Sequence, residues 1–215
     1  LNKQLDMYID RVSKVLNLTG INFNTVPVLD ISRKNTHKII GNRSYSNNKS
    51  IVSKIGSLVI KKFKKNKINT IIKHIPGHGL AKADSHVSLP KINKNLAYLL
   101  KNDFYPFRQN SHIAMTAHLL FYKIDQKKPV THSKKMIEII RSKIGFKGIL
   151  LTDDISMKAL KYSLSENIKL AFTAGCNIVL HCNANFREME IVAKNSPLID
   201  KFIIKKTSQM LKNIS

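Results

Sequence analysis

Residues 145–154 read GFKGILLTDD, and this segment indicates the fold class. Its continuous apolar run is typical of a strand covered on both faces, and the run ends in two adjacent carboxylates. A helical pattern over 133–144 precedes it, Gly145 ends that helix, and helical segments over 155–174 follow it. A strand that lies between two helices in the chain is the repeating unit of a parallel sheet.

The same alternation extends outward to both ends of the chain. We expect five strands, at 21–28, 69–73, 113–117, 147–152 and 177–180. We expect helices over 1–18, 49–65, 93–108, 133–144, 155–174 and 198–213. A loop that contains Gly and Pro covers 74–92. The pattern predicts an α/β fold built around a parallel sheet.

Polar residues follow every expected strand at its carboxyl end. In chain order they are Asp30, Lys73 with His74, His118, Asp153 with Asp154, and His181. Ligands of α/β proteins bind at this edge of the sheet. The sequence therefore predicts an active site there.

Composition limits the classes of function. The chain has 215 residues, a net charge of +24 and a pI near 10.1, which invites a nucleic-acid interpretation. However, Lys supplies 31 of the 37 basic residues in scattered positions, and Trp is absent, which leaves few rings for base stacking. No apolar run is long enough for a membrane helix, and residues 1–20 are too charged for a signal peptide. Two cysteines favour a reducing cytoplasm.

The densest motif is KHIPGHG at residues 73–79, followed by Asp84 and His86. Pro and Gly exclude a helical zinc motif, although zinc held by three loop histidines stays open. Alternatively, the loop presents Lys73 and His74 to sugar hydroxyls or anionic groups. Asp84 can accept the ring N–H of His86 and raise its basicity, or both can simply be solvated.

The two carboxylates after the fourth expected strand have three possible roles. Each can be a nucleophile, a metal ligand or a helix N-cap. Asp154 suits the cap because a helix is expected to follow it. Two adjacent carboxylates cannot both be caps, so one of them is expected to point into the site.

Taken together, these segments resemble glycoside hydrolase family 3, in its bacterial cytoplasmic β-N-acetylglucosaminidase (β-hexosaminidase) branch. The resemblance covers nearly the whole chain and weakens after Asn183. It rests on FNTVPVLD at 23–30, GNRSY at 41–45, KHIPGHG at 73–79 with DSH at 84–86, MTAH at 115–118, and GFKGILLTDDISM at 145–157.

The resemblance implies a (β/α)₈ TIM-type barrel that removes terminal β-linked N-acetylglucosamine from peptidoglycan fragments during cell-wall recycling. It implies Asp153 as the nucleophile, His86 as the acid/base and Asp84 as the partner of His86. It implies Arg43, Lys73 and His74 as sugar-binding residues. No metal, cofactor, nucleic acid or membrane is expected in the reaction, and the only expected partner is the sugar substrate in the cytoplasm.

The chain departs from the family in one respect. Its five expected strands match the fourth to eighth of the barrel, so residues 1–215 correspond to the C-terminal part of a single barrel domain. The inner face of the sheet is then expected to be open, and the isolated chain weakly stable. The alternatives are an inactive truncated remnant of the enzyme and, with less support, a basic nucleic-acid-binding protein.

Overall fold

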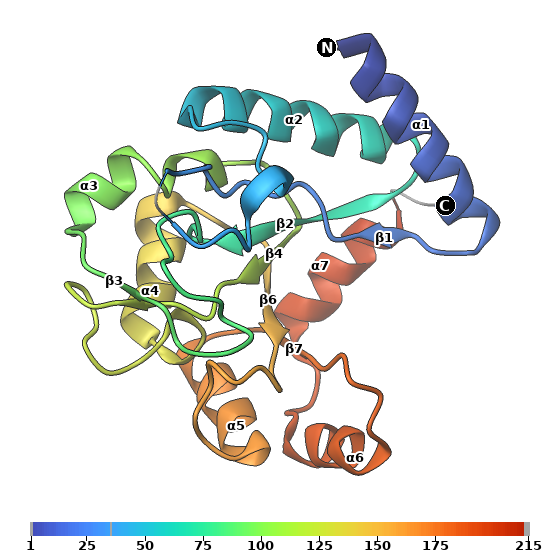
Figure 1. The fold of residues 1–215 in the computed structure, drawn as a ribbon. Helices are drawn as coiled ribbons and strands as arrows, with labels where there is room; N and C mark the ends of the chain where they lie inside the picture. The colour runs from blue at the N-terminus through green and yellow to red at the C-terminus, as the bar shows by residue number, and fades with distance from the viewer. Residues whose placement is uncertain (1, 35, 213–215) are drawn as a thin grey trace.

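The computed structural model describes residues 2–34 and 36–212 and has α/β architecture (Figure 1). Its main sheet has five parallel strands in the order β1-β2-β4-β6-β7, so strands adjacent in the sheet also follow one another in the chain. The strands are β1 (Phe23–Asn24), β2 (Asn69–Ile75), β4 (Ile113–Thr116), β6 (Ile149–Asp154) and β7 (Ile178–Leu180). The predicted parallel β–α alternation is confirmed.

A second, two-stranded parallel sheet lies outside the expected set. It pairs β3 (Lys91–Ile92) with β5 (Leu120–Phe121). Strand β3 lies in the connection after β2, and β5 lies in the connection after β4. Each has only two residues, which is too short to give a recognisable pattern in the sequence.

The described part of the chain has seven α-helices, of which α1 precedes the first strand and the others connect or follow strands. They are α1 (Asn2–Leu18), α2 (Lys49–Lys65), α3 (Leu96–Lys101), α4 (Lys134–Ile139), α5 (Leu164–Ala174), α6 (Phe186–Asn195) and α7 (Lys201–Leu211). A π-helical turn continues α4 through Ile144, and short 3₁₀ turns lie at Gly41–Arg43, Tyr105–Phe107 and Val130–His132.

Three helix predictions need correction. The expected helix over 93–108 is α3 followed by a separate 3₁₀ turn, because Pro106 interrupts the pattern. The helix expected from residue 155 begins only at Leu164, after a series of turns, and its N-cap is Ser163. Helix α6 was not predicted, although Asn185 caps it by accepting a hydrogen bond from the main-chain N–H of Glu188.

Both faces of the sheet are covered, as the continuous apolar strands predicted. On one face Ile72, Ala114 and Leu150 pack into the large core that the connecting helices share. On the other face Ile71, Ile113, Met115, Ile149 and Leu151 form a second core with Met210 of α7, and Ile203 of α7 packs against it. Figure 1 shows α7 beside the strands.

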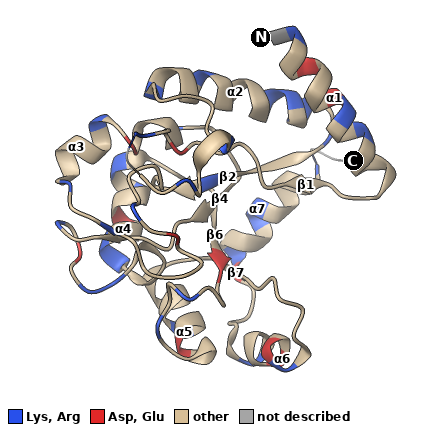
Figure 2. Ribbon diagram, viewed as in Figure 1, with Lys and Arg blue, Asp and Glu red and all other residues tan. Residues whose placement is uncertain are grey.

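The expectation of an open inner face is therefore wrong for these residues. Helix α7 supplies apolar side chains to the face that would otherwise be exposed, which removes one of the reasons for expecting weak stability. Strands β1 and β7 are still the edges of an open sheet, and weak stability stays a prediction. Lys and Arg lie along α1, α2, α4 and α7 and on the loops rather than on one element (Figure 2). Acidic residues stand at the end of β6 and also on α1, α4, α5 and α6.

Candidate active site

The candidate site lies at the carboxyl end of β2 and β6, where parallel strands place residues that are distant in sequence side by side. Met115 of β4 pairs with both Lys73 of β2 and Leu151 of β6, so the three strands end in register. The ring Nε2 of His74 lies 4.0 Å from Oδ2 of Asp153. The structure thus brings together two of the residues predicted for one site.

The two adjacent carboxylates have different environments. Asp153 keeps about a fifth of its side chain exposed, and its Oδ1 accepts the main-chain N–H of Asp154 at 2.9 Å. Oδ1 of Asp154 accepts from the main-chain N–H and the hydroxyl of Ser156, at 3.1 and 2.8 Å. Asp154 therefore closes a turn and caps no helix, which corrects its predicted role. Asp153 faces the site, as predicted.

His118 fixes the turn after β6 from the neighbouring strand. Its Nε2 donates to the main-chain carbonyl of Asp154 at 3.0 Å, and its Nδ1 lies 2.7 Å from the hydroxyl of Thr131. The imidazole is completely buried, and this burial lowers the pKa of His118. The predicted strand-end position of His118 is confirmed, and its contacts give it a structural role.

Asp30 is a predicted strand-end residue with no role assigned to it from the sequence, and it lies beside His74 in the site. It is completely buried after β1, where its carboxylate receives the main-chain N–H groups of His74 and His78 and the Nδ1 atom of His74. Burial by itself would raise the pKa of Asp30, but the charge and hydrogen bonds of His74 and the N–H of His78 outweigh it, so the pKa is lowered. The sequence did carry a signal for Asp30, because this carboxylate follows an expected strand, as the other predicted site residues do.

His78 joins this buried group to the loop that carries the predicted acid/base. Its Nε2 lies 3.2 Å from Oγ of Ser85, and its ring packs edge-on against that of His74. Burial is the main cause that lowers the pKa of His78 to about 4. Ser85, which stands between the predicted pair, is only 2% exposed.

Asp84 and His86 form the predicted pair, but in an exposed loop. Oδ1 of Asp84 accepts the main-chain N–H of His86 and lies 2.8 Å from its ring Nδ1. The main-chain N–H and the ring of His86 lower the pKa of Asp84. The side chain of His86 is 63% exposed, and within the described residues it makes no ion pair with Asp153. The structure confirms that Asp84 and His86 form a pair, but this pair is separate from the contact between His74 and Asp153.

Arg43 and Lys73 line the β1 side of the site. With Thr25 and Tyr45 among other residues, they border a hollow of about 370 Å³ between the sheet end and helices α1 and α2. Nζ of Lys73 donates to Oγ1 of Thr25 at 3.2 Å, and burial, followed by the charge of Arg43, lowers the pKa of Lys73. The guanidinium of Arg43 bonds the carbonyl of Ile39.

His181, the last predicted strand-end residue, contacts helix α6. Its Nε2 lies 2.7 Å from a carboxylate oxygen of Glu188 on α6. Among the described residues, no three His, Cys, Asp or Glu side chains are grouped as a metal site would require. None of the described helices is long and apolar enough to cross a membrane.

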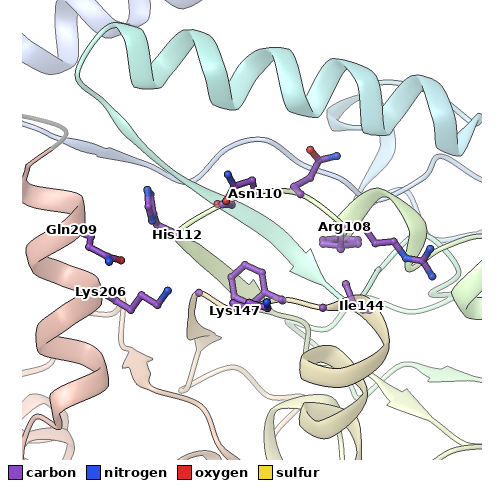
Figure 3. Close-up of a pocket in the computed structure, with 13 residues that line it drawn as sticks. Arg108, Asn110, His112, Ile144, Lys147, Lys206 and Gln209 are labelled. Carbon is purple, nitrogen blue, oxygen red and sulfur yellow. The ribbon is translucent and has the colours of Figure 1, made fainter.

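A separate hollow of about 480 Å³ lies at the other end of the strands, where the chain enters β4 and β6 (Figure 3). Lys206 and Gln209 extend into it from α7, and His112 and Lys147 stand on the loops that enter β4 and β6. None of the predicted site residues lines it. Because chemistry in parallel β–α folds occurs at the carboxyl ends of the strands, this hollow is not the candidate active site.

Asp153 and His74 thus lie at the carboxyl ends of parallel strands, which is the end that carries the active site in barrel enzymes. The sequence profile of the glycosyl hydrolase family 3 N-terminal domain matches residues 8–212. The chain therefore belongs to glycosyl hydrolase family 3, as the resemblance indicated.

Relatives agree with this placement. A β-hexosaminidase of Neisseria meningitidis serogroup C is 34% identical over 174 residues, which cover 78% of this chain and 48% of the relative. The chain thus spans about half the length of that relative.

Among solved structures, NagZ of Neisseria gonorrhoeae in complex with N-trifluoroacetyl-D-glucosamine has 29% identity and a TM-score of 0.86, with 97% of this chain and 62% of that chain covered. The same NagZ in complex with a zinc ion has 28% identity and a TM-score of 0.84, with coverages of 97% and 61%.

Proposed function

We propose that this chain carries the catalytic residues of a retaining glycoside hydrolase that removes terminal β-linked N-acetylglucosamine from peptidoglycan fragments in the cytoplasm. The observation that carries the proposal is Asp153 beside His74 at the end of β6, with the Asp84–His86 pair on the loop after β2. The N-acylglucosamine bound to the related NagZ supports this class of sugar. The peptidoglycan origin of the substrate rests on the resemblance to the cytoplasmic branch of the family.

The reaction proceeds in two displacements. The carboxylate of Asp153 attacks the anomeric carbon and forms a glycosyl ester, while the bond to the leaving oxygen breaks and that oxygen takes a proton from His86. Water then attacks the same carbon and gives a proton to His86, and the ester bond to Asp153 breaks. Asp84 holds Nδ1 of His86, which leaves Nε2 to exchange the proton.

The remaining polar residues bind the sugar. Lys73 and Arg43 are donors along the hollow beside the site, and His74 stands next to the nucleophile. The exposed position of the Asp84–His86 pair requires loop 82–88 to approach the sugar during the reaction, because no described contact joins His86 to Asp153.

The test is trapping of the covalent intermediate on this chain. With a 5-fluoro N-acetylglucosaminyl fluoride, we expect a single mass addition that peptide mapping locates at Asp153. Asp153→Asn should abolish it, whereas the matched variant Asp154→Asn should retain it because Asp154 faces Ser156. Labelling of another carboxylate would refute the assignment.

The acid/base is tested by leaving-group dependence. His86→Ala should largely spare the first step on an activated aryl glycoside, seen as a burst of released phenol, because this leaving group needs little protonation. Cleavage of the natural disaccharide should be lost almost entirely. A chain that neither turns over nor becomes labelled would agree with the inactive-remnant alternative. The nucleic-acid alternative has less support, because the basic side chains are spread over many elements (Figure 2).

A further inference from the structure

Asp30 is a completely buried carboxylate with three N–H groups around it. One oxygen takes the main-chain N–H of His78 at 2.6 Å, and the other takes the main-chain N–H of His74 at 3.1 Å. The ring Nδ1 of His74 lies 2.7 Å from that second oxygen. Such a set of donors stabilises the ionised form and lowers the pKa of Asp30 despite burial.

This arrangement determines which ring nitrogen of His74 carries a proton. An ionised carboxylate can only accept hydrogen bonds, so the Nδ1 atom that faces it must be the donor. The other nitrogen, Nε2, is the one that points at Oδ2 of Asp153. Their separation of 4.0 Å exceeds the length of a direct hydrogen bond, which leaves Nε2 able to bond a sugar hydroxyl.

We propose that Asp30 is a positioning residue of the candidate site: it holds the His74 imidazole with Nδ1 protonated and Nε2 directed toward the nucleophile and the sugar. Its role in catalysis rests on the proposed function, whereas the assignment of the proton to Nδ1 does not. Asp30 itself is completely buried and acts only through His74.

The substitution Asp30→Asn separates this role from simple packing. In one orientation the amide NH₂ faces Nδ1 of His74, and the ring proton must move to Nε2. In the other orientation the NH₂ opposes the main-chain N–H of His78, so two donors face each other. Neither orientation preserves all three hydrogen bonds, and we expect the pure Nδ1–H form of His74 to be lost.

The measurement is ¹⁵N NMR of the ring nitrogens in the 215-residue chain, with the His74 signals identified by a His74→Gln variant. The wild type should show a protonated Nδ1, and Asp30→Asn should show a mixture of forms or protonation at Nε2. In the same variant, kcat/KM for an aryl N-acetylglucosaminide should fall by about 100-fold or more, as expected when a catalytic imidazole has the wrong tautomer.

Asp103→Asn is the matched control. Asp103 is also a buried carboxylate, only 2% exposed, but its partner is the guanidinium of Arg33 at 3.0 Å. Removing its charge should reduce stability without changing the proton position in His74. A change of tautomer in this control as large as that in Asp30→Asn would overturn the proposal, because the effect would then follow from loss of any buried charge.

Two other results would also overturn it. One is a folded Asp30→Asn chain in which His74 keeps protonated Nδ1 and unchanged kcat/KM. The other is a wild-type chain in which Nδ1 of His74 carries no proton, which decides the question even if the variant does not fold. An inactive wild type with protonated Nδ1 would refute the proposed function and leave the assignment of Asp30 standing.

Discussion

Acid should destabilise the folded chain through His132, a histidine outside the candidate site. His132 is 3% exposed, and its Nε2 atom has no hydrogen-bond partner among the described residues. Its ring lies beside that of Tyr162. Burial, followed by the charge of His118, lowers the pKa of His132 from 6.5 to about 4. The unfolded chain therefore binds a proton at a higher pH than the folded chain does.

The sign and size of the effect follow from linkage. Because the folded pKa is depressed, stability is greatest above pH 6.5 and falls as the pH drops from 6.5 toward 4. Between about pH 7.5 and 4.5, one such group costs about 2–3 kcal/mol of unfolding free energy. His78, with a pKa of about 4, adds a loss in the same direction.

Urea unfolding followed by circular dichroism at the two pH values measures the loss. His132→Phe removes the titrating group and keeps a planar ring beside Tyr162. Between about pH 7.5 and 4.5, we expect the unfolding free energy of His132→Phe to decrease less than that of the wild type, by a difference of about 2–3 kcal/mol. His37→Phe, at an exposed histidine, is the control and should retain the full wild-type loss. Equal losses for wild type and His132→Phe would refute the reasoning.

Three further predictions concern the site and its supports. Ser85→Ala removes the hydroxyl that contacts His78, so it should lower the rate on the natural disaccharide more than the rate on an activated aryl glycoside. The control Ser88→Ala, at an exposed neighbouring serine, should leave the ratio of these two rates unchanged. Gly79→Ala would place a Cβ atom 2.1 Å from the carbonyl oxygen of Ile31, and thermal melting should show a destabilisation of about 1–3 kcal/mol. Activity should survive exhaustive chelation, because the proposed mechanism uses only carboxylates and imidazoles; loss of activity with recovery on adding zinc would contradict it.

The sequence predicted the order and direction of the five main strands because each is an apolar run bounded by turn residues. It also predicted Lys73, His74 and Asp153 at one edge, since parallel strands align their carboxyl ends. It could not predict that Asp30 meets His74, because that contact depends on how the chain after β1 crosses the end of β2. Nor could it place α7 against Ile71, because a period of 3.6 residues identifies an apolar helical face without saying what that face contacts.

Asp30 and Ser85 also explain why two histidines four residues apart should hold their protons on different nitrogens. The carboxylate of Asp30 requires a proton on Nδ1 of His74. In His78, Nδ1 is buried without a partner in the part of the chain that the structure describes, and Nε2 contacts Ser85. A buried N–H without an acceptor is rarer in proteins than an unused lone pair, so the proton of neutral His78 belongs on Nε2, where it is donated to the hydroxyl of Ser85. A second proton would have to enter at Nδ1, where burial offers it no acceptor, and this gives a structural reason for the pKa of about 4.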